Sequence, residues 1–187
     1  MKVKKKTVLN LLLIFLVLSF FVTPLGNYAK IGLMQLFSRA PGIIEKEERE
    51  RIPSYDWTLK DANWDFFSFE RSRGKVILLD FWASWKLPSL PELKGIQKLY
   101  DTYGDRVDFY IITDEERAPV EAFMKEHGFT FPVTYLYLES EPPIPTSDPP
   151  RSYLIDRQGY IVVDQKGLAD WDAGRIRELL DQLLQSP

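Results

Sequence analysis

The residues best placed for chemistry lie in or just after one apolar segment, residues 76–82. Asp80 is the charged residue inside that segment, and Lys86 and Ser89 follow it closely. A lysine beside a carboxylate can serve as an acid–base pair, and a serine beside a histidine can serve as a nucleophile. The one histidine, His127, belongs to a different predicted helix, and no oxyanion pattern accompanies it, which disfavours a serine–histidine site.

Cysteine is absent from all 187 residues. Thiol chemistry, thioether attachment of haem and zinc sites built from cysteine are therefore excluded. A single histidine also makes a histidine-based metal site improbable, so we expect neither a metal ion nor another cofactor. A domain of this length can fold around an apolar core without disulfide bonds.

The charges divide the chain into a basic stem and an acidic domain. No acidic residue precedes Glu45, and the first 44 residues hold six of the 24 lysines and arginines. The remainder carries 18 basic and 27 acidic residues, a net charge of −9. Because nucleic-acid binding requires a basic face, the composition argues against a nucleic-acid partner.

Residues 1–25 have the pattern of a signal anchor. Lys2, Lys4, Lys5 and Lys6 precede an apolar run over 8–22, which is at the short end of what spans a bilayer as a helix. The positive cluster predicts a cytoplasmic N-terminus and a domain on the outer, periplasmic side. A cleaved signal peptide is the alternative, and the poor cleavage site at 27–29 disfavours it.

Residues 26–52 are predicted to be a juxtamembrane segment and a linker. Apolar residues recur every three positions over 28–37, which fits either an interfacial membrane helix or a helix packed on the domain. Pro41-Gly42 ends that helix, and the charge run over 45–51 is expected to be solvated.

Residues 53–187 have the pattern of one α/β domain with helices on both faces of its sheet. Five of the ten residues over 141–150 are proline, which predicts a stiff, irregular loop. The other predicted elements are a hairpin over 55–69, a strand over 76–82, a helix over 91–103, a strand over 107–113, a helix over 119–127, an extended segment over 131–138, a hairpin over 152–163 and a helix over 173–184.

Three segments resemble the membrane-anchored TlpA/ResA-like thiol–disulfide oxidoreductases. Residues 74–100 contain Trp82-Ala83-Ser84-Trp85 after a buried strand, where the family has Trp-Ala-x-Trp followed by Cys-x-Pro-Cys. Residues 150–162 resemble the strand after the cis-proline of the family, with Pro150 in that place, and residues 120–133 resemble its helical insert. The resemblance covers about 53–184 and implies a thioredoxin-like fold, with a central mixed β-sheet flanked by helices, an N-terminal β-hairpin and a membrane anchor.

The same resemblance places Lys86 and Ser89 where the family has its two cysteines, and Pro88 keeps its place between them. Exchange in this family needs a thiolate and a second thiol that releases the mixed disulfide. Lysine has no sulfur, and a serine hydroxyl does not ionise usefully near neutral pH. We therefore expect a redox-inactive member, although the family alone implies a thiol–disulfide oxidoreductase.

Each conspicuous side chain also has a purely structural interpretation. Lys86 either points into water or pairs with Asp80 or an anionic group of a partner. Asp80 matches a buried acid of the family, and we expect it to pair with Lys86 or Lys75. Glu115 lies in a charged triplet that indicates a solvated loop, although some relatives carry a functional glutamate in this region.

The expected binding surface is an apolar edge beside the former cysteine positions. Its candidates are Trp82, Trp85, Leu87, Pro88 and Pro150, although tryptophans more often serve packing. In the family this edge binds an extended chain beside the cis-proline, so the predicted partner is an extracytoplasmic protein or extended peptide segment. The first hypothesis is therefore a membrane-anchored, redox-inactive domain that acts as a protein-binding or scaffold module, and the second is a thiol–disulfide oxidoreductase. A non-redox enzyme that uses Lys86 with Asp80 is the third.

Overall fold

A computed structural model describes residues 5–146 and 148–185, apart from the side chains of 24 and 25. Lys2 and Lys4 of the predicted basic cluster lie outside the described residues. The chain divides into two compact units, Met1–Phe37 and Ser38–Pro187.

The first unit contains α1 (Lys5–Val22) and α2 (Pro24–Phe37). Pro24 begins α2. The first N–H groups of a helix make no hydrogen bond within the helix, so a proline, which has no N–H, is tolerated at this position. Within the described residues, α1 is the one helix long and apolar enough to cross a membrane, and its side chains are exposed in the unit. A signal sequence near an N-terminus has the same length and composition.

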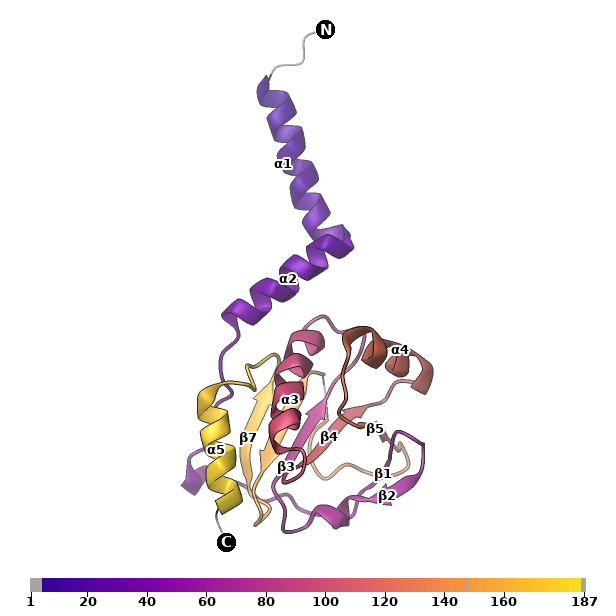
Figure 1. The fold of residues 1–187 in the computed structure, drawn as a ribbon, viewed down its shortest axis with the longest axis vertical. Coiled ribbons are helices and arrows are strands. Elements are labelled where there is room, and N and C mark those ends of the chain that lie inside the picture. Colours follow the sequence, from indigo (N-terminus) through magenta and orange to yellow (C-terminus); the bar gives the residue numbers. More distant parts are fainter. Residues whose placement is uncertain (1–4, 147, 186–187) are drawn as a thin grey trace. The chain divides into compact units, whose positions relative to one another are not determined.

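The second unit is built on a seven-stranded mixed sheet with the order β2-β1-β5-β4-β3-β6-β7 (Figure 1). The central strands β3, β4 and β5 are parallel, and the other neighbouring strands are antiparallel. The first two strands form the predicted N-terminal hairpin. The strands are β1 (Thr58–Lys60), β2 (Phe66–Ser68), β3 (Ile77–Phe81), β4 (Asp108–Thr113), β5 (Val133–Leu136), β6 (Arg151–Ile155) and β7 (Ile161–Lys166).

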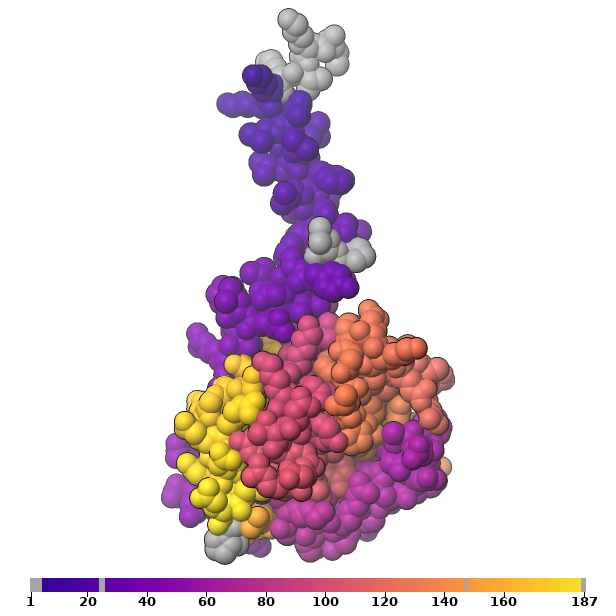
Figure 2. Space-filling view, in the orientation of Figure 1, coloured from indigo at the N-terminus to yellow at the C-terminus, as the bar shows by residue number. Residues whose placement is uncertain are grey.

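Three helices, α3 (Ser89–Tyr103), α4 (Arg117–His127) and α5 (Gly174–Gln185), cover one face of the sheet (Figures 1 and 2). Their buried residues belong to one shared apolar core, so the expectation of α-helices on both faces was wrong. The crossovers β3-α3-β4 and β4-α4-β5 step across the sheet in the same direction and have the same hand, which places both helices on one side.

The opposite face is covered by irregular chain and a short 3₁₀ helix, η2 (Phe69–Ser72). Tyr55, Trp57, Phe69 and Ile144 pack there against the sheet in a second apolar core. Ile144 comes from the crossover between β5 and β6, whose prolines prevent a helix. The proline-rich segment therefore crosses the sheet as an ordered loop.

The charged segment expected to be a linker runs along the outer edge of β7. Its short 3₁₀ helix η1 (Lys46–Glu48) is flanked by backbone hydrogen bonds to the domain. The N–H of Ile44 donates to the Val162 carbonyl at 2.8 Å, and the N–H of Ile161 donates to the Glu50 carbonyl at 2.8 Å. These bonds satisfy backbone groups of an edge strand and make this segment part of the second unit.

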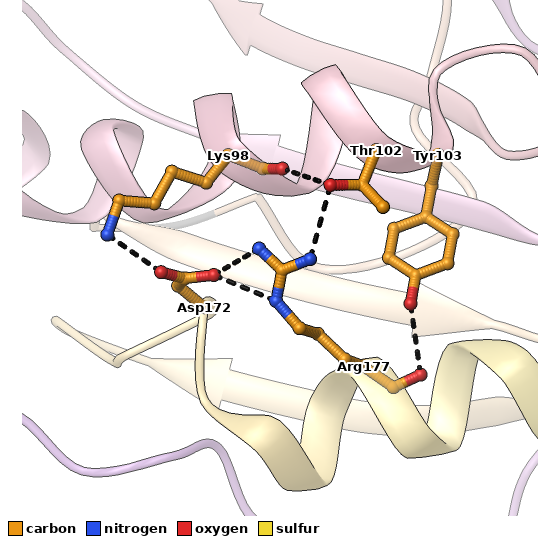
Figure 3. A network of polar contacts seen from close by, with 5 residues as sticks. All are labelled: Lys98, Thr102, Tyr103, Asp172 and Arg177. Atoms are coloured by element: carbon orange, nitrogen blue, oxygen red, sulfur yellow. Dashed lines mark hydrogen bonds and ion pairs between the residues drawn. The ribbon is translucent and has the colours of Figure 1, made fainter.

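A polar network joins α3 to the chain that leads into α5 (Figure 3). The carboxylate of Asp172 accepts hydrogen bonds from Lys98 Nζ at 2.7 Å and from Arg177 Nε at 2.9 Å. Arg177 also donates to Thr102 Oγ1 at 3.2 Å. Burial alone would raise the pKa of Asp172, but the bonds from Lys98 and Arg177 outweigh it, so the pKa lies below its ordinary value.

We expect Asp172→Asn to lower the free energy of unfolding by about 1–3 kcal/mol, because two cations lose a partly buried anionic partner. Urea unfolding of the detergent-solubilised chain, followed by tryptophan fluorescence, measures this loss. The control is Asp105→Asn, since that carboxylate is 80% exposed and its contact with Arg106 is 3.5 Å long. Equal effects of the two substitutions would contradict the assigned role of the network.

Candidate functional site

The candidate site lies at one edge of the sheet, where three parallel strands end. The chain leaves β3 at Trp82, β4 at Asp114 and β5 at Tyr137, and parallel strands end on the same side. Strand β6 is antiparallel to β3 and begins there, because Arg151 pairs with Phe81. Pro150 therefore meets the segment after β3, as the sequence predicted.

The segment between β3 and α3 folds into two consecutive turns. The N–H of Lys86 donates to the Ala83 carbonyl at 3.1 Å, and the N–H of Ser89 donates to the Lys86 carbonyl at 3.0 Å. Ser89 then begins α3 and is fully buried, with its Oγ 3.3 Å from the Ala83 N–H. This hydroxyl is thus enclosed at the start of a helix.

The two tryptophans of the motif have different environments. Trp82 is 2% exposed and packs against Phe123 with ring centroids 5.2 Å apart, so it belongs to the core. Trp85 is 69% exposed. Of the two, only Trp85 offers a surface to a partner.

Lys86 forms an ion pair with Asp148, in the loop just before Pro150. Its Nζ lies 2.7 Å from Asp148 Oδ1 and 5.3 Å from the centre of the Trp85 ring. The hydrogen bond from Lys86 lowers the pKa of Asp148. Because the amine lies at the surface and Asp80 points beneath α3, the predicted Lys86–Asp80 pair does not form. Lys75 pairs instead with Asp108, at 3.0 Å.

The Pro149–Pro150 peptide bond is cis, as the sequence predicted. Pro150 is buried, and its carbonyl accepts a hydrogen bond from the N–H of Gly167 at 2.8 Å. Leu87 and Pro88 are half-buried in the turn that precedes α3. Trp85, Leu87, Pro88 and Pro150 are the apolar residues that lie next to Lys86 and Asp148 along the chain, and we refer to them as the rim.

Beneath α3, Asp80 lies in a buried polar cluster with Glu92, Ser152 and Trp171. Ser152 Oγ is 2.7 Å from Asp80 Oδ1 and 2.9 Å from Glu92 Oε1, and Trp171 Nε1–H donates to Glu92 Oε1 at 2.9 Å. Both carboxyl groups are fully buried, and among the described residues Asp80 Oδ2 and Glu92 Oε2 have no hydrogen-bond partner. One serine proton cannot serve two carboxylates at once.

This environment keeps protons on the carboxyl groups. Burial raises the pKa of Asp80 to about 7, against the opposing effect of the Ser152 hydrogen bond. Burial, and next the charge of Asp80, raise the pKa of Glu92 well above its ordinary value. The cluster can hold a proton near neutral pH, but Lys86 is too far from it to complete the acid–base pair of the third hypothesis.

Glu92 was missed in the sequence, although a signal for it was present. It shares a helical stripe with Ile96, Leu99 and Tyr103, at spacings that place all four on the buried side of α3. An acidic residue on such a stripe must be neutral or hydrogen-bonded.

Glu115 was also misjudged, because it is not part of a solvated loop. Its carboxylate accepts hydrogen bonds from the Ser84 N–H and from the Ser84 hydroxyl, both at 2.6 Å. It therefore fixes the turn that presents Trp85. The neighbouring Asp114 and Glu116 are exposed, as expected.

Among the described residues, no group of three or more acidic or histidine side chains is arranged to hold a metal ion. The contacts described above provide ion pairing, proton retention and apolar contact. The chain contains no cysteine and therefore no thiol.

The fold and its cis-proline edge define a thioredoxin-like domain. Comparison with known proteins supports this class: the sequence model of the AhpC/TSA family matches residues 50–135. A putative protein disulfide isomerase from Bacteroides thetaiotaomicron aligns with a TM-score of 0.63 at 25% identity, over 79% of this chain and 95% of that one. The putative interchange protein DsbE from Chlorobium tepidum aligns with a TM-score of 0.58 at 20% identity, over 73% and 96% of the chains.

Two relatives with similar sequences point to one group within the thioredoxin-like proteins. The thioredoxin-like protein YneN of Bacillus subtilis (strain 168) is 26% identical over 161 residues, which are 84% of this chain and 87% of that protein. The thiol-disulfide oxidoreductase ResA of Bacillus cereus (strain ATCC 10987 / NRS 248) is 27% identical over 145 residues, 70% and 79% of the two chains. These similarities agree with the resemblance to the TlpA/ResA-like proteins that the sequence motifs indicated, and this chain differs from that pattern in having no cysteine.

The buried acids predict that stability falls as pH rises. The folded protein holds a proton on Asp80 up to about pH 7, whereas the unfolded chain releases it near its ordinary pKa of 3.8. The free energy of unfolding should therefore decrease between about pH 4 and pH 7, by on the order of a few kcal/mol. Asp80→Asn should make that decrease smaller in urea unfolding at a series of pH values, and the part that remains is expected from Glu92, whose pKa burial also raises.

The matched control for this pH series is Glu126→Gln, because Glu126 is exposed on α4. It should leave the pH dependence unchanged. The contrary outcome is a free energy of unfolding that rises between pH 4 and pH 7, by the same amount in the wild type and in Asp80→Asn. That outcome would show that burial does not raise the pKa of Asp80.

Proposed function

We propose that this chain is a membrane-anchored thioredoxin-like module that binds an extracytoplasmic protein segment and performs no thiol–disulfide exchange. The observation that carries the proposal is the intact edge at Trp85 and Pro150 in a chain that contains no cysteine. The cis-proline and the exposed tryptophan are present where the cysteines of the family are missing, which supports binding without exchange.

The rim around Lys86 has the composition of a protein-binding surface. Tryptophan is enriched among the residues that dominate protein interfaces, and Trp85 is 69% exposed. Leu87 and Pro88 extend the apolar area, and the Lys86–Asp148 pair supplies polar groups at its centre. An extended segment could lie across this rim with its backbone beside Pro150.

Membrane anchoring is supported by α1 and by the basic residues that begin it. Lys5 and Lys6 are the first residues of α1, an 18-residue helix whose apolar run covers 8–22, and a positive flank favours the cytoplasmic side. The domain would then lie outside the membrane, at its periplasmic face. Retention of α1 as an anchor, rather than its removal as a signal peptide, is part of the proposal.

A thiol–disulfide oxidoreductase is the second candidate, and the printed name of the relative ResA favours it. The buried acids Asp80 and Glu92 would suit proton transfer to a nearby thiol. However, neither Lys86 nor Ser89 can form the mixed disulfide that exchange requires. We therefore rank the oxidoreductase second, because the activity in the name of the relative needs cysteines that this chain does not have.

We expect the purified full-length chain to reduce insulin disulfides no faster than buffer with dithiothreitol alone. The double substitution Lys86→Cys and Ser89→Cys should raise the rate severalfold, because it places a thiol before α3 and a second one at its N-terminus. The two single substitutions are the controls and should stay near background. Wild-type activity above background would establish the oxidoreductase in place of the scaffold.

A photoreactive residue at position 86 should crosslink to a protein segment in cells, whereas the same residue at exposed position 126 should give at most background. Adding Trp85→Ala should reduce the yield at position 86 severalfold, since it removes the largest exposed apolar group of the rim. Equal yields at the two positions, read by immunoblotting, would argue against a specific partner at this edge.

A further inference from the structure

Exposed apolar side chains gather at the hairpin end of the domain. Over described residues 38–146 and 148–185, four large apolar side chains are exposed, and three of them are in this region. Trp64 is 44% exposed, Phe66 is 59% exposed and Leu138 is 89% exposed. Soluble domains seldom expose neighbouring large apolar groups without a binding role.

These side chains surround a cavity of about 310 Å³. Trp64 and Leu138 line it directly, together with Tyr135 and Tyr137. Phe66 packs against Tyr137 with ring centroids 4.9 Å apart. The cavity thus has aromatic walls from the hairpin and from the end of β5.

The charged lining of the cavity is strongly acidic. Four carboxylates face one lysine, Lys60, whose amine already lies over the Trp64 ring at 4.8 Å and the Phe66 ring at 5.0 Å. The four carboxylates belong to Asp114, Glu115, Glu116 and Glu139.

Two of these carboxylates are already used within the domain. Glu115 accepts hydrogen bonds from Ser84, and Glu139 accepts one from the Tyr137 hydroxyl. Asp114 and Glu116 make no hydrogen bond or ion pair within the part of the chain that the structure describes, and both are exposed. The lining is therefore complementary to a cation that has an apolar stem.

Glu115 connects the cavity to the turn that carries Trp85. Glu115 lines the cavity and also holds Ser84, the residue before Trp85. The ends of β3 and β5 are two strand spacings apart, about 10 Å, which an extended chain crosses in about three residues. One segment can reach both places.

We propose that this cavity receives a lysine or arginine side chain of the same protein segment whose apolar residue contacts Trp85. The inference rests on the proposed function, because it assumes a partner at the rim, and it adds the chemistry of that partner. The aliphatic stem of the basic residue would lie against Trp64 and Leu138. Its charged end would meet Asp114 and Glu116, while the acidic lining would repel anionic segments.

Fluorescence anisotropy with defined peptides tests the proposal. The probe is a labelled nine-residue peptide of alanine and serine that contains one leucine and, three positions later, one arginine. The comparison peptide has glutamate in place of the arginine. The full-length chain in phosphatidylcholine nanodiscs should bind the arginine peptide at least tenfold more tightly than the glutamate peptide. Empty nanodiscs give the background, and the difference should shrink as salt is raised.

Substitutions assign the binding to the cavity. The double variant Asp114→Asn and Glu116→Gln should weaken binding of the arginine peptide at least fivefold, and Leu138→Ser should weaken it to a smaller extent. The control Glu178→Gln removes an exposed carboxylate on α5, away from the cavity, and should change nothing.

The outcomes separate this inference from the proposed function. If Trp85→Ala abolishes peptide binding and the double variant does not, the rim remains the binding surface and the proposed role of the cavity is wrong. Equal affinity for the two peptides, or no binding of the arginine peptide, would also overturn the cavity. The proposed function would then still be decided by the crosslink at position 86.

Discussion

The burial of β3 on both faces is the constraint from which the site follows. Alternate residues of a strand point to opposite sides, so Ile77 and Leu79 enter one core while Leu78 and Asp80 face α3. A carboxyl group in that position must keep its proton or find donors. Ser152, on the neighbouring strand, and Glu92, on the covering helix, complete a cluster in which burial disfavours charge.

The same constraint separates the interior chemistry from the surface. Lys86 leaves the core in the turn after β3 and pairs with Asp148, whereas the acids stay enclosed beneath α3. The proton-holding groups therefore have no reactive neighbour, and the exposed part of the site offers contact area and charge. A binding module without turnover is consistent with this division.

Sequence patterns predicted the elements whose apolar periods are strong, among them the hairpin at β1 and β2, the strand β3 and the helix α3. They also located the edge, because Pro150 stands directly before a recognisable strand. The Lys86–Asp80 pair was wrong, since the sequence does not reveal that the turn after β3 brings Lys86 to Asp148, which is distant in the chain. Glu92 was missed and Glu115 was assigned to a solvated loop, because their partners, Ser152, Trp171 and Ser84, are distant in the chain and unremarkable by themselves.

The proline-rich crossover between β5 and β6 has a consequence for local stability. Prolines contribute no N–H groups to hydrogen bonding, and among the described residues of this crossover Ile144 is the one that enters the apolar core. Its other ties to the domain include the bond from the Tyr153 hydroxyl to the Pro145 carbonyl and the Lys86–Asp148 pair. Because Ile144 is the one described side chain of this crossover in the apolar core, we expect the crossover to open locally before the helical face of the sheet unfolds, and its amides to exchange with solvent earlier than those of that face.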